Sequence, residues 1–318
     1  MSVTALYACD VLDDGSVAVL ESIDAAEPAN LAFRWIHLDL KTEGVRAWLE
    51  RNCDPVVALA LSRQDTRPTV NPVDNGNIII LRGVNLNPES DPEDMVSIRL
   101  WVQPKRIIST RIRRLMAITA IREQIGAGNP PRTIADFLVR LTAGLTERMD
   151  PVVAELSDRI DDLEEQSVDR SSGLRSDLAE IRRTVIALRR YIAPQRDVLY
   201  RLAGDTSGLL DRATQVRLRE TSDQVMRMVE ELDSVRDRCA ILNDQLVDKR
   251  AEEMNTNMMV LSVVAAIFLP LSFLTGLLGI NVGGMPGAEF AWAFYIVCGL
   301  CLFIGGSLTW WFHRKGWF

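Results

Sequence analysis

The chain has 318 residues, a formal net charge of −7 and five scattered cysteines. Two of the 36 basic and three of the 43 acidic residues follow Arg250, so the part before it is acidic too, which argues against nucleic acid as a partner and suits a protein that attracts cations. The odd number of cysteines indicates reduced thiols in a cytoplasmic protein rather than a disulfide framework.

The first 131 residues have the pattern of a cytoplasmic α+β domain. Runs rich in β-branched and aromatic residues, bounded by turn formers, predict a mixed or mostly antiparallel sheet. The expected strands are Val3–Cys9, Val17–Leu20, Phe33–Leu38, Ile78–Val84, Met95–Val102 and Arg106–Thr110. The expected helices are Glu43–Arg51, Asp54–Ser62 and Arg113–Ile125. No nucleotide-binding loop and no nucleophile–base pair occurs at a motif spacing, so we do not expect an enzyme.

Residues 132–254 have a helical pattern and predict a cytoplasmic stalk. We expect Asp150-Pro151 to reset the pattern, turns at Ser171-Ser172-Gly173 and at residues 204–208, and a kink or helix end at Pro194. Within residues 175–201, arginines surround an apolar stripe: Arg182, Arg183, Arg189, Arg190 and Arg196. We favour a solvated face with salt bridges for this run over an anion-binding site.

The last part of the stalk predicts one very long helix. No glycine or proline occurs from about Leu209 until Pro270. Apolar residues recur mostly at three- and four-residue steps: Val216, Val225, Met228, Leu232, Val235, Ile241, Leu242 and Leu246. A single helix to Gly279 would be on the order of 100 Å long. Such a helix needs to pack on residues 133–203 and on copies of itself.

A first transmembrane helix is expected at residues 255–280. The stretch has no acidic residue and no Lys, Arg or His, and it exceeds the roughly 20 apolar residues that cross a bilayer. Small, amide or hydroxyl residues and two large apolar ones share one helical stripe: Asn255, Met258, Ser262, Ala265, Leu269, Ser272 and Gly276. In a membrane this stripe must turn away from lipid, toward other helices or water.

A second span is expected at residues 290–312, after a short loop at residues 281–289 and before a tail at residues 313–318. Trp292, Trp310 and Trp311 lie near its ends, as in an interfacial aromatic belt. Lys and Arg flank the pair of spans, at positions 249–250 and 314–315, whereas the loop has neither. The positive-inside rule therefore places both termini in the cytoplasm and the loop outside.

The end of the first span carries a resemblance. Pro270–Asn281 ends in Gly279-Ile280-Asn281, and Val282-Gly283-Gly284-Met285-Pro286-Gly287 follows. This segment resembles the Gly-Met-Asn signature and Met-Pro loop of the CorA-type divalent-cation transporters. The isoleucine and the Gly-Gly-x-Pro-Gly loop are more similar to the zinc-transporter branch of that family. Trp35–Asp39 and the Leu-Arg-Arg…Pro-x-Arg run at residues 188–196 are similar to family segments as well.

The resemblance implies a homopentamer in a bacterial inner membrane that transports Zn²⁺, with no cofactor. Each residue of the stripe would become a ring of five along the pore. Gly279, Ile280 and Asn281 would form the selectivity motif, and Leu269 and Met258 would be apolar constrictions that gate by dewetting. The alternative for Asn281 is a simple helix cap.

The metal preference does not follow from the residues. A stripped divalent ion needs carboxylate, thiolate or imidazole ligands, which the stripe lacks, so its neutral groups suit an ion that keeps much of its water. Cys298 and Cys301 are one turn apart, and we favour packing residues over a metal site or a redox pair. His37 and His313 are isolated. A magnesium-branch channel for Mg²⁺, Co²⁺ or Ni²⁺ and a membrane-anchored coiled-coil scaffold remain the alternatives.

Overall fold

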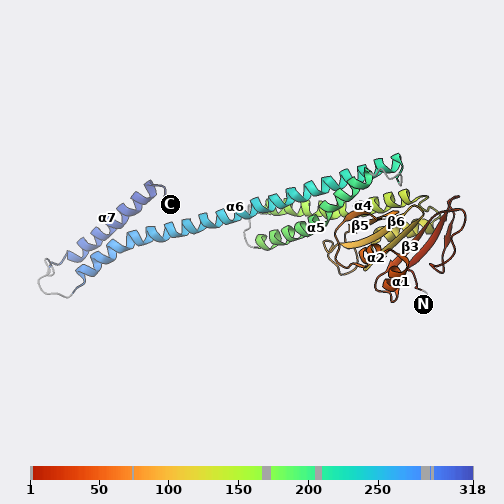
Figure 1. Cartoon of the computed structure of the whole chain (residues 1–318). Helices are drawn as coiled ribbons and strands as arrows, with labels where there is room; N and C mark the ends of the chain where they lie inside the picture. The colour runs from red at the N-terminus through yellow and green to blue at the C-terminus, as the bar shows by residue number, and fades with distance from the viewer. Residues whose placement is uncertain are drawn as a thin grey trace. The chain divides into compact units, whose positions relative to one another are not determined.

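A computed structural model of the chain describes residues 3–73, 75–166, 173–204, 210–280, 287 and 290–317. These residues form two compact units, Met1–Leu242 and Asn243–Phe318. The first unit contains a sheet with helices on both faces, and the second contains the two most apolar helical segments (Figure 1). The expected α+β domain, long helix and apolar C-terminal helix are thus confirmed. The finer division at residues 131, 254, 280, 289 and 312 stays a prediction.

The sheet of the first unit has seven strands in the order β2-β1-β3-β7-β6-β5-β4. Their bounds are Tyr7–Leu12 (β1), Val17–Val19 (β2), Leu31–Asp39 (β3), Thr69–Val73 (β4), Gly76–Gly83 (β5), Val96–Gln103 (β6) and Arg106–Arg111 (β7). Only the β3–β7 pair is parallel, and every other neighbouring pair is antiparallel. The mixed sheet expected from the sequence is therefore present.

The interior strand β3 is buried on both faces because helices cover the sheet on each side. Ile36 points to a core that α1 (Val45–Asn52) and α2 (Pro55–Ser62) complete on one face. Trp35 points to the other face, where the centroid of its ring lies 4.9 Å from the centroid of the Phe137 ring. This two-sided burial explains why apolar residues occupy successive positions of β3, such as Trp35 and Ile36, rather than alternating with polar ones.

Three helices cover the second face: α3 (Met116–Gly126), α4 (Ile134–Gln166) and α5 (Leu174–Ala203). The buried side chain of Gln195 joins α5 to the sheet, because its Oε1 accepts a hydrogen bond of 2.7 Å from the backbone N–H of Arg82. Arg82 lies just beyond the last residue of β5 that pairs with β4, so its N–H has no partner in a neighbouring strand. Gln195 therefore supplies an acceptor to a backbone N–H that would otherwise be buried without a hydrogen-bond partner.

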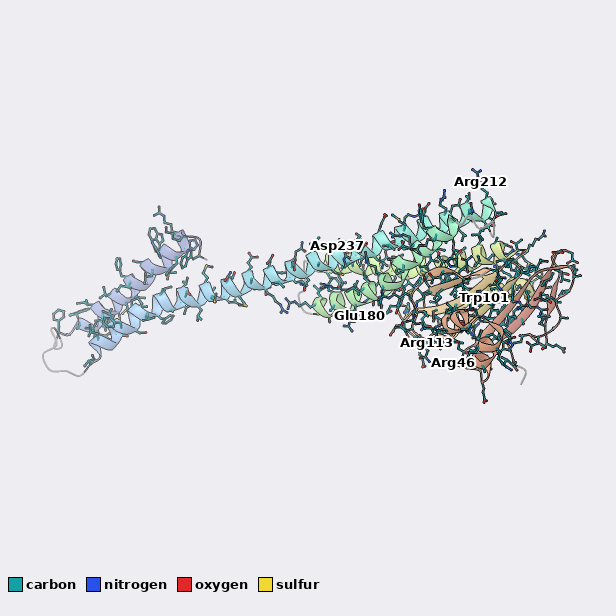
Figure 2. All side chains as sticks on the ribbon, in the orientation of Figure 1. Arg46, Trp101, Arg113, Glu180, Arg212 and Asp237 are labelled. Carbon is teal, nitrogen blue, oxygen red and sulfur yellow. The ribbon has the colours of Figure 1, made fainter. Side chains whose placement is uncertain are left out.

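The long helix α6 spans Arg212–Leu278, close to the expected Leu209–Gly279. Within the first unit, ion pairs connect it to α4 and α5: Arg189–Asp233 at 2.6 Å and Arg238–Glu164 at 2.6 Å. Figure 2 labels two of the charged side chains of this region, Glu180 and Asp237. The salt-bridge interpretation of the α5 arginines therefore holds for Arg189. Its ion pair with Asp233 joins α5 to α6, however, rather than two residues along one helix.

Several expectations about local structure were wrong. Strand β4 was missed because it contains Pro72, which an edge strand tolerates since one side of it needs no ladder hydrogen bond. Pro151 lies inside α4 and does not interrupt it, and the helix end expected as one outcome at Pro194 is wrong because α5 continues past it, whereas the kink stays a prediction. A helical proline costs about 3 kcal/mol, and the long buried faces of these helices outweigh it.

Other expectations about segment ends and packing met mixed results. Strand β1 begins at Tyr7 rather than Val3. Val216 and Ile241 of the expected apolar stripe are exposed, whereas the other six are buried. Ser171 and Ser172 of the first expected turn, and residues 205–208 of the second, lie outside the described residues, while Gly173 directly precedes α5 with φ of 99°.

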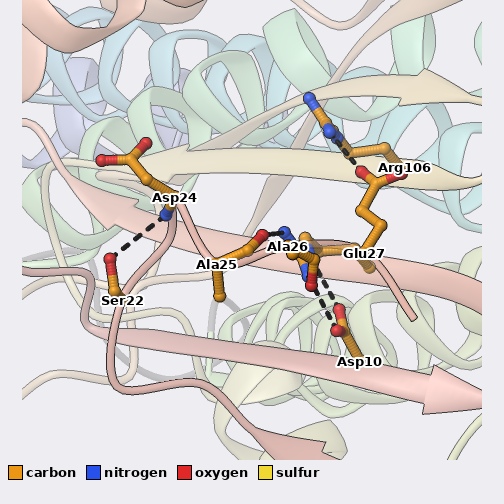
Figure 3. A network of polar contacts seen from close by, with 8 residues as sticks. Asp10, Ser22, Asp24, Ala25, Ala26, Glu27 and Arg106 are labelled. Carbon is orange, nitrogen blue, oxygen red and sulfur yellow. Dashed lines mark hydrogen bonds and ion pairs between the residues drawn. The ribbon is translucent and has the colours of Figure 1, made fainter.

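A buried ion pair joins the first two long strands of the sheet. Arg34 of β3 donates from Nε and Nη2 to the two carboxylate oxygens of Asp10 on β1, at 2.6 and 2.8 Å. The guanidinium also donates to the carbonyl oxygens of Ala25 and Ala26, in the network of Figure 3. Both charged side chains are almost fully buried. The carboxylate and the carbonyls together satisfy most of the guanidinium donors, as burial of this charge requires.

Candidate functional site

The second unit contains the two helical segments that are long and apolar enough to cross a membrane. They are the C-terminal part of α6 and the helix α7, Ala293–Arg314, with mean hydropathies of 2.3 and 1.8 in their most apolar windows. Almost none of either window is buried within the chain. A core helix of a water-soluble protein would be mostly buried, so this exposure favours lipid or other subunits as the surroundings.

Within this unit, α6 and α7 pack against each other through one face of each helix. Leu271 on α6 lies 3.6 Å from the position that a Cβ on Gly305 of α7 would occupy. The less exposed residues of this part of α6 follow helical spacing: Met259, Val263, Ile267, Leu271 and Leu274. Those of α7 do the same: Ala293, Val297, Cys301, Ile304, Gly305, Leu308 and Phe312. Small residues at such a contact allow two helices to approach closely.

The expected pore-lining stripe lies on the opposite side of α6 from this contact. At 100° per residue, Asn255, Met258, Ser262, Ala265, Leu269, Ser272 and Gly276 cluster about half a turn from the residues that face α7. All seven are exposed in the single chain. Ser262 donates its hydroxyl hydrogen to the carbonyl oxygen of Met258 at 2.8 Å, which satisfies that hydroxyl within the helix. The helix pair therefore leaves this stripe free for other chains or for water.

The expected selectivity motif begins where α6 ends. The helix ends at Leu278, and the N–H of Gly279 donates to the carbonyl oxygen of Thr275 at 2.9 Å. Ile280 is about half exposed. Asn281 lies outside the described residues, as do residues 282–286, 288 and 289 of the loop. The position of Gly279 at the helix end agrees with a turn out of the membrane helix, and the role of Asn281 stays a prediction.

The described residues contain no group of three or more His, Cys, Asp and Glu side chains that could hold a metal ion. Cys298 is exposed and Cys301 is partly covered on the face toward α6, and both are free thiols. In the first unit Cys9 is buried, and burial raises the pKa of its thiol to about 12. Such a thiol stays protonated at neutral pH and is a poor metal ligand.

His37 is a structural residue of the sheet. It is fully buried, its Nδ1 lies 2.8 Å from the hydroxyl oxygen of Ser109, and its Nε2 has no hydrogen-bond partner. Burial lowers the pKa of His37 to about 3, and the charges of Arg111 and Arg122 act in the same direction. The imidazole is therefore neutral in the folded protein near neutral pH.

The burial of His37 predicts a loss of stability in acid. Below a pH of about 6.5 the unfolded chain binds a proton that the folded chain binds only near pH 3, so stability is retained above pH 6.5 and lost as the pH falls. Between pH 6.5 and 5 the unfolding free energy should fall by up to about 1.4 kcal/mol per pH unit from this group. Denaturation midpoints measured across this range should depend less on pH in His37→Asn, and an unchanged slope would contradict the assignment.

The comparisons with known proteins agree along almost the whole chain. The family described as "CorA-like Mg2+ transporter protein" matches residues 30–314. The zinc transport protein ZntB of Pectobacterium atrosepticum is 34% identical over 285 residues, which cover 89% of this chain and 87% of that protein. The divalent cation transporter CmaX of Pseudomonas aeruginosa is 36% identical over 293 residues, covering 88% of this chain and 86% of that one.

A solved structure shows a similar fold over the full length. The structure of the full-length CmaX protein superposes with a TM-score of 0.84 at 31% identity, and it covers 99% of this chain and 98% of that chain. The similarity therefore includes the sheet, the helices that cover it, the long helix and the C-terminal helix.

Proposed function

Because the chain belongs to the family of CorA-like Mg²⁺ transporter proteins, we propose that it carries divalent metal cations, with Zn²⁺ as the main substrate, across a membrane. The observation that supports this function most directly is the exposed stripe of α6, on the side away from α7. The names of the relatives support zinc, since the chemistry of the stripe does not select it. The family and both named relatives are described as transporters.

The pathway requires several copies of the chain. Two helices cannot enclose a path for ions, so the stripes of several subunits must meet around an axis, and closed rings are the usual arrangement. We propose a homopentamer with α6 nearest to the axis and α7 outside it. Neutral amide, hydroxyl and backbone groups of the stripe would then contact the hydration water of the passing ion, whereas Met258 and Leu269 would form apolar constrictions.

The proposed orientation of the two spans in the membrane rests on the positive charges that flank them. Lys249 and Arg250 precede the first span and Arg314 and Lys315 follow the second, so we propose that both termini lie in the cytoplasm of a bacterial cell and that Asn281 faces outward from the inner membrane. No residue from Asn255 to Ile280 titrates near neutral pH. A coupling to protons would therefore use acidic residues outside this stretch, such as Glu252 and Glu253.

The test is ion uptake into proteoliposomes of the purified protein. Zn²⁺ uptake should exceed Mg²⁺ uptake, and Asn281→Ala should lower Zn²⁺ uptake or its preference over Mg²⁺ by about tenfold, since it removes a ring of amide oxygens at the outer end. The matched control is Asn257→Ala, which removes an exposed amide of α6 that lies off the stripe. Comparison with and without an inward proton gradient separates a coupled carrier from a passive channel.

Three other outcomes would each point elsewhere. Mg²⁺ uptake that exceeds Zn²⁺ uptake and ignores the proton gradient would show a channel of the magnesium branch. Equal losses in Asn281→Ala and Asn257→Ala would contradict a special role for Asn281. Absence of uptake for every ion, with Asn281→Ala indistinguishable from the parent protein, would leave the pair of spans as an anchor for a coiled-coil scaffold.

A further inference from the structure

A shallow groove of about 370 Å³ lies on the exposed side of α7. Its lining consists of Leu302, Phe303, Gly306, Ser307 and Trp310. Gly306 forms the floor, because a Cβ at this position would meet no atom within 4 Å. The neighbouring Gly305, by contrast, contacts Leu271 of α6. The groove therefore opens away from α6, on the side of α7 that the rest of the chain leaves uncovered.

Positive charge lies at the C-terminal end of this groove. Arg314 is one helical turn beyond Trp310, and its guanidinium carbon lies 5.4 Å from the centroid of the Trp310 ring. Lys315 follows directly, and both side chains are exposed. Within the part of the chain that the structure describes, no carboxylate pairs with either cation. Tryptophan beside arginine at the end of an apolar helix is typical of the depth at which lipid headgroups lie.

We propose that this groove binds an anionic phospholipid, with one acyl chain over Gly306 between Phe303 and Trp310 and with the phosphate on Arg314 and Lys315. The lining is apolar except for Ser307, so it suits a hydrocarbon chain. Two cations without a carboxylate partner favour a headgroup with net negative charge over a zwitterionic one. An α7 helix from a second copy could fill the groove, but it contains no Asp or Glu and would leave these cations without a counter-charge.

The proposal needs only that α7 lies in a membrane, and it is independent of which ion the protein carries. Its test is native mass spectrometry of the full-length protein, extracted in detergent and supplied with equal amounts of phosphatidylglycerol and phosphatidylcholine. The parent protein should retain phosphatidylglycerol about fivefold more than phosphatidylcholine, as expected for one or two cations near a headgroup.

Two variants test the two ends of the site, and each has a matched control. Gly306→Leu fills the groove and should lower the number of retained lipids. Arg314→Gln should leave that number unchanged and remove the preference for phosphatidylglycerol. Thr309→Leu adds bulk to an exposed position of the same helix outside the groove, and Arg250→Gln removes a cation from the other flank of the spans, so both should behave as the parent protein.

The contrary results are equally specific. Equal retention of the two lipids by the parent protein would overturn the proposal, since it would indicate a general lipid coat. The same would follow if Thr309→Leu lost as many lipids as Gly306→Leu. If Gly306→Leu instead lowered the mass of the oligomer and left the retained lipid unchanged, the groove would be an interface with a second copy and the lipid site would be excluded.

Discussion

Replacing Leu269 by serine is expected to raise the resting flux of divalent cations through the reconstituted protein by about tenfold. Leu269 is the largest aliphatic residue of the exposed stripe, and 69% of its surface is exposed in the single chain. In a ring of subunits, five leucine side chains around the axis would keep the narrow part of the path free of water. Serine is smaller and polar, so water would enter and the barrier to a hydrated ion would fall.

The measurement is uptake of Zn²⁺ into proteoliposomes at equal protein content. Val264→Ser is the matched control, because Val264 is also exposed and aliphatic but lies off the stripe. In a membrane its removal changes only a contact with lipid or with a neighbouring helix. Unchanged flux in Leu269→Ser, or an equal rise in Val264→Ser, would show that the stripe does not line the path.

Replacing Asp10 by alanine should lower the unfolding free energy of the first unit by about 3–5 kcal/mol. The change leaves the guanidinium of Arg34 buried with two carbonyl oxygens and no hydrogen-bonded carboxylate. Removal of one partner of a buried pair costs far more than the pair contributes, because the remaining charge has lost its water as well as its partner. The loss of unfolding free energy can be measured by denaturing the purified protein and monitoring the unfolded fraction by pulse proteolysis.

Two further variants separate this cause from a general effect of the substitution. Glu27 pairs with Arg106 near the surface, where both side chains are about 40% exposed, so Glu27→Ala should cost less than about 1 kcal/mol. The double variant Asp10→Ala with Arg34→Met removes both charges and should recover much of the loss. A double variant as unstable as Asp10→Ala alone would contradict the charge argument.

The sequence predicted the architecture where its patterns were long and regular. The run without glycine or proline from about Leu209 to Pro270 predicted α6 almost to the residue, and the two charge-free stretches predicted the apolar segments of the second unit. Strand β4 could not be found, because Pro72 and Asn71 are atypical of strands and its formation depends on pairing with β5. Pro151 and Pro194 misled for a similar reason, since tertiary packing overrides a local helix penalty.

The same distinction applies to the candidate site: features within one helix could be predicted, whereas contacts between elements could not. Helical spacing alone brought the seven residues of the stripe together, since that depends only on residues of one helix. Which face of α6 meets α7 depends on both helices at once, and only the structure shows that Leu271 and Gly305 meet. The buried pair of Asp10 and Arg34 was missed because charges within strands usually face water, although an arginine in a strand as apolar as β3 was a signal for a buried partner.

The parallel pairing of β3 with β7 affects how the protein is made. Residues 31–39 cannot complete their pairing until residues 106–111 have left the ribosome, since β7 lies between β3 and the strands β6, β5 and β4. About 144 further residues are then translated before Asn255 emerges. At roughly 5–20 residues per second this takes about 7 to 29 s, which exceeds the folding time of many domains of mixed topology. The nascent chain can therefore complete its sheet before its first apolar segment is available for insertion into a membrane.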